Sequence, residues 1–154
     1  MTETSTDEII AELKKLDLKS APLEDPTSYK SLIEKICCNN LKKVECKNHF
    51  LTPTLMTAIF DSLNKSSTDN KKANAANLVA ELAKYDACKE FVINPNLVST
   101  LIGNLESTNV DVLLQTCRAL GNICYENSEF NKLLLQYVSY AISALECCYG
   151  FYNG

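Results

Sequence analysis

The side chains best able to bind a metal or act as nucleophiles here are the cysteines and the histidine. The sequence holds eight cysteines and one histidine in 154 residues. Cys46-Lys-Asn-His49 is the one metal-like fragment, with Cys37 and Cys38 upstream, but its spacing matches no common zinc framework and no CxxC occurs. We therefore expect no metal and no cofactor, and most cysteines to be small buried hydrophobic residues. A metal or redox role for the cysteines stays open as an alternative.

Residues for acid–base or nucleophilic catalysis do not gather in a recognisable pattern. His49 is predicted to be an exposed loop residue without a partner for proton transfer. Cys117 and Cys124 are predicted to lie on an apolar helix stripe, where a thiol is a poor nucleophile. No Gly-rich stretch resembles a phosphate-binding loop. The sequence predicts a binding protein and not an enzyme.

The composition fits one globular domain with an acidic balance. The chain is 46% hydrophobic and 22% charged, with a formal net charge of −4. A pI near 5.0 argues against nucleic acid as a partner, because phosphate binding depends on Lys and Arg. The N-terminus resembles no secretion signal, and the most apolar stretch, Val138–Tyr152, is too short to span a membrane. We expect a cytoplasmic protein without a transmembrane segment.

The elements that must position any site are helices, because apolar residues recur at helical spacing and no segment alternates strictly. Short turns are expected at Asp86 to Ile93, and Lys19 to Thr27 is predicted to be a linker. Thr108 with Asp111 resembles a capping box for the sixth helix. The predicted helices cover about Asp7–Leu18, Ser28–Asn39, Pro53–Asn64, Asn70–Lys84, Pro95–Glu106, Val110–Tyr125 and Ser128–Cys148.

These helices repeat along the chain. Phe50–Leu63 aligns with Val92–Leu105 at an offset of 42, with Pro over Pro and the apolar residues in register. Ala76–Ala83 aligns with Cys117–Cys124 at an offset of 41. A period of about 42 residues built of helices alone indicates HEAT or armadillo repeats, whereas tetratricopeptide and ankyrin periods are near 34.

One helix carries a family resemblance. Ala119-Leu-Gly-Asn122-Ile-Cys resembles the third helix of an armadillo repeat, and Val112–Tyr125 as a whole closely resembles the armadillo-repeat small-GTPase GDP-dissociation stimulators, the smg-GDS family. Leu13–Leu16 and Ala75–Lys84 are similar to that family's opening segment. The resemblance implies an all-α, right-handed armadillo solenoid with about two full repeats flanked by partial ones. The expected organisation is an N-terminal helix and linker (1–27), armadillo repeats (28–127) and a truncated repeat with a divergent apolar tail (128–154).

By this resemblance, third helices line a concave groove, and the candidate partner-binding residues are Asn77, Glu81, Arg118 and Asn122. Residues four apart share a helix face, so Asn77 with Glu81, and Arg118 with Asn122, are expected to point into the groove together. Ser31 and Lys35 are weaker candidates in the preceding repeat. The competing interpretation is a hydrogen bond within one repeat for Asn122 and solvated charges for the others.

The resemblance implies a function in small-GTPase regulation. The expected partners are Rho- or Rap-type GTPases with basic C-terminal tails, which the chain would bind, stimulate to release GDP, or chaperone. We interpret the chain as the N-terminal portion of such a protein, in a short form. An armadillo scaffold that binds partners without exchange activity is the alternative. The resemblance also implies association with the endoplasmic reticulum and mitochondria.

Overall fold

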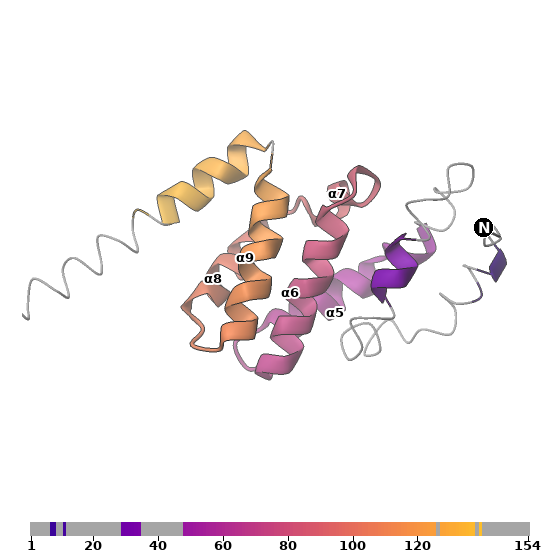
Figure 1. The fold of residues 1–154 in the computed structure, drawn as a ribbon, viewed down its shortest axis with the longest axis horizontal. Coiled ribbons are helices and arrows are strands. Elements are labelled where there is room, and N and C mark those ends of the chain that lie inside the picture. Colours follow the sequence, from indigo (N-terminus) through magenta and orange to yellow (C-terminus); the bar gives the residue numbers. More distant parts are fainter. Residues whose placement is uncertain are drawn as a thin grey trace, which may run out of the picture. The chain divides into compact units, whose positions relative to one another are not determined.

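A computed structural model describes residues 7–8, 11, 29–34, 48–125, 127–137 and 139 (Figure 1). Every regular element among them is helical. None of the described helices is long and apolar enough to cross a bilayer. The main elements are α5 (Pro53–Leu63), α6 (Asp69–Ala83), α7 (Asp86–Val92), α8 (Pro95–Gly103), a 3-10 turn η1 (Asn104–Glu106) and α9 (Val110–Cys124).

The starts of α5 and α8 confirm the predicted repeat. Each helix has proline at its first position, where the missing N–H has no intrahelical partner to lose. The Thr52 hydroxyl accepts from the Leu55 N–H at 3.2 Å, and the Asn94 side chain accepts from Asn96 and Leu97. Two helices 42 residues apart therefore begin with the same local chemistry.

The N-cap of α9 differs from the prediction. Asn109, not Thr108, caps the helix, because its Oδ1 accepts from the Val112 N–H at 3.1 Å. Ser107 in turn accepts from the Asn109 N–H at 3.1 Å, which holds the capping residue in place. A capping box was predicted one residue too early because Thr and Asn are both good caps in adjacent positions.

The stretch predicted to be short turns is a helix. α7 covers Asp86–Val92, in which Cys88 and Val92 are buried. Seven residues span barely two turns, which is too short for the apolar period to show in the sequence. With α7, residues 86–124 contain three α-helices, α7, α8 and α9.

The core lies around α6, which is packed against α5 and α7 and hydrogen-bonded to α9. Alanine is frequent along α6, and small side chains let neighbouring helices approach closely on several sides. From the segment 29–34, the Tyr29 hydroxyl donates to the Asn74 carbonyl of α6 at 3.0 Å. The buried residues of α6 are Ala73, Ala75, Ala76, Leu78, Val79, Ala80, Glu81, Leu82 and Ala83.

The chain divides into two compact units, 1–123 and 124–154. In the second unit a helix begins at residue 128, as predicted, after an N-cap in which Asn127 accepts from the Phe130 N–H at 3.2 Å. Most of the predicted helices Asp7–Leu18 and Ser28–Asn39, and the end of the predicted helix Ser128–Cys148, lie outside the described residues.

Candidate functional site

Arg118 joins the two third-helix positions of adjacent repeats. Its Nη2 donates to Glu81 Oε1 at 2.9 Å, and its Nη1 donates to Asn77 Oδ1 at 3.3 Å. Nη1 also donates to Gln115 Oε1, one turn earlier on α9. Three of the four predicted groove residues therefore form one cluster between α6 and α9.

Glu81 is the buried centre of this cluster. Its residue is only 2% exposed, and Lys84 Nζ bonds its second carboxylate oxygen at 3.0 Å. Burial alone would raise the pKa of this carboxyl, but hydrogen bonds from Lys84 and Arg118, with the nearby charges of Lys84 and Lys30, outweigh it and lower the pKa. The interpretation of Glu81 as a solvated charge is wrong, because the carboxylate is held by cations beneath the surface.

Asn122 does not make the hydrogen bond within one repeat that the competing interpretation expected. Its Nδ2 donates to the Ala80 carbonyl of α6 at 3.0 Å. The bond joins α9 to a helix of the preceding repeat, so it is not a hydrogen bond within one repeat. It ties an amide side chain to a backbone carbonyl of a neighbouring helix and thereby fixes how the two helices stack.

The sequence separations of these bonds reproduce the repeat period. Arg118 and Asn77 are 41 residues apart, and Asn122 and Ala80 are 42 apart. On the other side of the repeat, Asn104 Nδ2 donates to the Leu63 carbonyl across 41 residues at 3.2 Å. A solenoid stacks each repeat on its neighbour, so equivalent positions meet. Asparagine amides make these contacts on two different helices.

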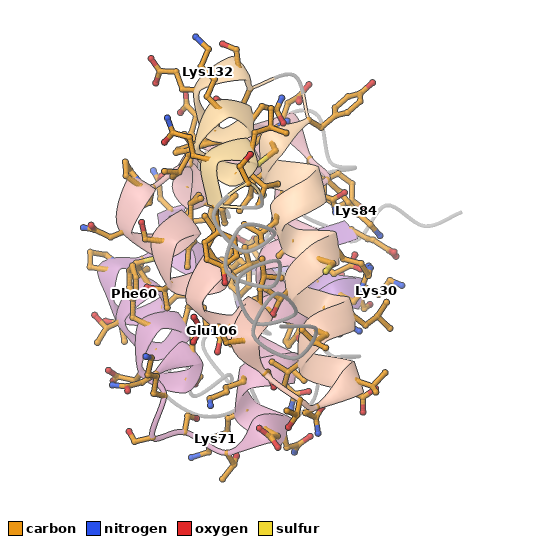
Figure 2. All side chains as sticks on the ribbon, turned by 90° about the vertical axis from the view of Figure 1, so that its left-hand side faces the viewer. Lys30, Phe60, Lys71, Lys84, Glu106 and Lys132 are labelled. Atoms are coloured by element: carbon orange, nitrogen blue, oxygen red, sulfur yellow. The ribbon has the colours of Figure 1, made fainter. Side chains whose placement is uncertain are left out.

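Part of the cluster reaches solvent. The side chains of Arg118 and Lys84 are 36% and 41% exposed. Asn77 and Asn122 are half-buried, and Lys30 and Ser31 are exposed. Figure 2 shows Lys30 and Lys84 on the same side of the molecule. Lys35, a weaker candidate, lies outside the described residues.

Sequence reasoning named Arg118 but missed the second cation of this cluster, Lys84. Lys84 lies three residues after Glu81 on the same helix face, a spacing that permits an ion pair. Arg118 is the sole arginine of the sequence. Its guanidinium is planar and donates in a fixed fork to three acceptors. A single arginine of this kind could have suggested a structural role.

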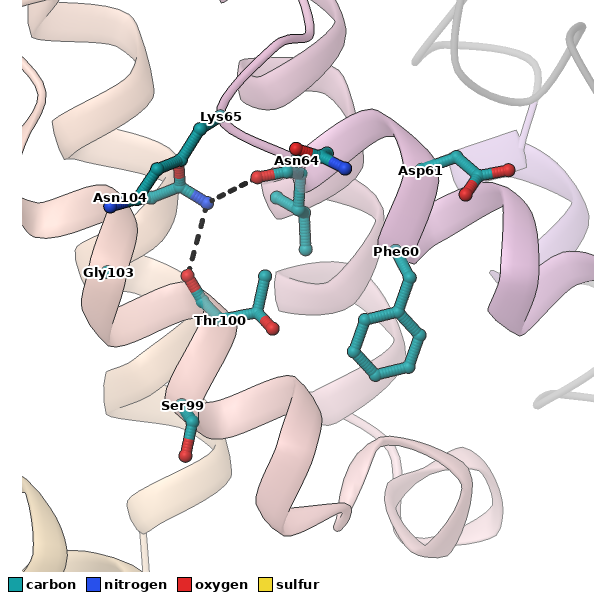
Figure 3. Close-up of a pocket in the computed structure, with 9 residues that line it drawn as sticks. Phe60, Asp61, Asn64, Lys65, Ser99, Thr100, Gly103 and Asn104 are labelled. Carbon is teal, nitrogen blue, oxygen red and sulfur yellow. Dashed lines mark hydrogen bonds between the residues drawn. The ribbon is translucent and has the colours of Figure 1, made fainter.

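A pocket lies where the ends of α5 and α8 meet (Figure 3). It has a volume of about 490 Å³ and is lined by Phe60, Asp61, Leu63, Asn64, Lys65, Ser99, Thr100, Gly103 and Asn104. Asn104 is the most polar buried residue of this pocket, and its Nδ2 donates hydrogen bonds to the carbonyls of Leu63 and Thr100. The pocket therefore offers a ligand few buried polar groups.

The cysteines and histidine form no metal site within the described residues. Cys88 and Cys124 are buried, as expected of small hydrophobic residues, but Cys117 is exposed. The prediction that Cys117 lies on the apolar stripe of α9 is therefore wrong, whereas Thr116 and Cys124 of the same stripe are buried. His49 is exposed, as predicted, but it lies in the helical residues 48–50 and not in a loop.

Comparison with known proteins identifies the repeat. Residues 86–125 match the model of the armadillo/β-catenin-like repeat, which covers α7, α8 and α9. Together with the helix-only architecture of the described residues, this confirms the predicted fold class, an all-α armadillo solenoid. No solved structure matches the chain.

Curated relatives confirm the family resemblance. The chain is 43% identical over 74 residues to Rap1 GTPase-GDP dissociation stimulators 1-B and 1-A of Xenopus laevis, covering 48% of this chain. It is 30% identical over 82 residues to the GTPase-GDP dissociation stimulator vimar of Drosophila melanogaster. The chain spans only 12–13% of the length of these relatives.

Proposed function

We propose that this chain binds small GTPases of the Rho or Rap type and regulates them, either by stimulating GDP release or by chaperoning them. The observation that carries the proposal is the 43% identity to proteins named Rap1 GTPase-GDP dissociation stimulators, in a chain with an armadillo repeat. No covalent chemistry is needed, because a regulator that prefers the nucleotide-poor GTPase shifts its partner toward that state. We infer a non-enzymatic role in the cytoplasm, with neither a cofactor nor nucleic acid.

The proposed contact surface is the third-helix face of α6 and α9. Asn77, Arg118 and Asn122 reach solvent there, and Glu81 acts from beneath by holding Arg118. The order imposed by these bonds supports a binding role, since a pre-arranged surface loses less entropy on association. Recognition of a basic C-terminal tail is a further part of the proposal, supported by the net charge of −4.

The experiment measures release of a fluorescent GDP analogue from a Rap GTPase, with this chain in excess. Accelerated release, relative to an unrelated acidic protein at equal concentration, supports exchange. Repeating the measurement with a GTPase that lacks its basic tail tests the tail separately. Equal acceleration with and without the tail would contradict tail recognition while leaving exchange intact.

Binding without exchange is the second candidate, and the short span of the chain favours it. A chain covering 12% of a relative offers a small part of that relative's surface. Calorimetric titration of the same GTPase with this chain separates the candidates. Heat of binding with unchanged GDP release supports a scaffold role, and no heat and no release would refute both.

A further inference from the structure

The surface over α6 and α9 carries more positive charge than its buried carboxylate neutralises. Lys84 and Arg118 both bond Glu81, at 3.0 and 2.9 Å. Lys30 lies close enough for its charge to act on the same carboxyl. Three cations around one carboxylate leave an excess of two positive charges. We call Lys30, Lys84 and Arg118 the cationic surface.

The cations have more N–H donors than Glu81 occupies. A guanidinium has five N–H donors, and Arg118 uses three of them within the described part of the chain, on Gln115, Asn77 and Glu81. Lys30 is exposed. Since the Arg118 and Lys84 side chains are about two-fifths exposed, a carboxylate from outside can reach them without displacing Glu81.

The surroundings limit the size and the kind of partner. Asp111 and Glu34 are exposed acidic residues that flank the surface: Asp111 precedes Arg118 by about two helical turns, roughly 10 Å, and Glu34 follows Lys30 by one turn. Leu114, one turn before Arg118 on the same face, is 53% exposed. A short acidic stretch with an apolar residue matches this combination, whereas a long uniformly acidic chain would meet the flanking carboxylates.

We propose that the cationic surface binds a short acidic segment of a protein partner, with carboxylates at Lys30, Lys84 and Arg118 and an apolar side chain on Leu114. The chemistry is opposite to that of a basic GTPase tail, because the carboxylate that the described residues place at the centre of this surface, Glu81, is buried and already paired. The inference goes beyond the proposed function and does not depend on it.

The test uses peptides and the full chain. A fluorescein-labelled ten-residue peptide with alternating Glu and Ser around one central Leu is titrated with the chain in 50 mM NaCl, with anisotropy as the readout. A matched peptide has Lys in place of Glu. The acidic peptide is expected to bind more tightly, and 500 mM NaCl is expected to weaken it strongly, because exposed charges are screened. The net charge of −4 alone predicts the reverse preference.

Point variants locate the site. Lys30→Gln, an exposed position, is expected to weaken the acidic peptide about threefold, the usual scale for one exposed ion pair. Lys71→Gln removes the same charge from an exposed position about 20 Å before Lys84 along α6 and is expected to change nothing. Glu81→Gln, checked for helicity by circular dichroism, is expected to tighten binding, since it raises the excess positive charge.

Several results would overturn the proposal. Tighter binding of the Lys peptide than of the Glu peptide would refute the cationic surface as a binding site. Equal losses of affinity for the acidic peptide in the Lys30 and Lys71 variants would refute it as well. If inorganic phosphate displaced the labelled peptide at the same concentration as the unlabelled peptide does, the surface would be a simple anion site. None of these results bears on GDP release, so failure here is distinguishable from failure of the proposed function.

Discussion

Removing the arginine that joins adjacent repeats should destabilise the protein more than removing its partner. In Arg118→Met, Glu81 keeps Lys84 as its hydrogen-bonded cation but loses a charged hydrogen bond of 2.9 Å, and its side chain is only 3% exposed in the wild type. Hydrogen bonds to charged groups contribute about 1.5–3 kcal/mol, and an incompletely paired buried charge adds to the loss. We expect a decrease of about 2 kcal/mol in the free energy of unfolding at pH 7.

In the reverse variant, Glu81→Gln, the unpaired groups are the cations, which are 36% and 41% exposed and can be hydrated. The expected cost is about 1 kcal/mol, on the low side of a charged hydrogen bond. Because the residues are in direct contact, the double variant should cost less than the sum of the single variants. Urea unfolding, followed by circular dichroism at 222 nm, measures the free energy of unfolding of the two single variants and the double variant. Lys71→Met is the control for loss of an exposed cation.

The pH dependence gives an independent check with a definite sign. The folded-state pKa of Glu81 is lowered, so its stabilisation is present above the ordinary glutamate pKa of about 4.3 and is lost as the pH falls through the folded value. The stability gap between the wild type and Arg118→Met should therefore narrow between pH 6 and pH 3. A gap that widens toward low pH, or equal and additive costs at pH 7, would refute the buried ion-pair argument.

Three further substitutions test local features of the fold by the same urea assay. Thr116→Val should stabilise the protein by about 1 kcal/mol, because the buried Thr116 hydroxyl has no hydrogen-bond partner among the described residues; an unchanged midpoint would contradict this. Asn109→Ala should cost about 1 kcal/mol through loss of the α9 N-cap, while Thr108→Ala costs little; the opposite order would restore the capping box at Thr108. Tyr29→Phe should cost about 1 kcal/mol by removing the hydroxyl donated to the Asn74 carbonyl, and no cost would mean that this contact does not hold the segment to α6.

Local chemistry made much of the fold predictable. The Thr-Pro and Asn-Pro starts of α5 and α8 are recognisable because the cap and the first helical residue are adjacent in sequence. The repeat period follows from aligning such starts. α7 was not predictable from pattern alone, since seven residues hold too few apolar positions to define a helical face.

The candidate site was predictable in its residues but not in its contacts. Helix periodicity places Glu81 on a face with Asn77, yet it cannot show that Arg118 of another helix covers that face. Cys117 shows the same limit: the apolar stripe of α9 is wide, and the neighbouring helices decide which edge is buried. Burial and pairing of polar groups depend on how the repeats stack, which no single helix encodes.

The buried Glu81 also changes what the overall charge implies about partners. A net charge of −4 suggests a surface suited to a basic tail, but net charge does not say where the carboxylates lie. On the third-helix face of α6 and α9, the buried Glu81 carboxylate is paired with Arg118 and Lys84. A basic segment that approaches this face therefore contacts these two cations first. If tail-dependent binding is measured, its acidic receptor must therefore lie elsewhere, among exposed carboxylates such as Asp61 or Glu106. Charge reversal at those positions, with Glu81 left intact, would then abolish tail dependence without loosening the contact between the repeats.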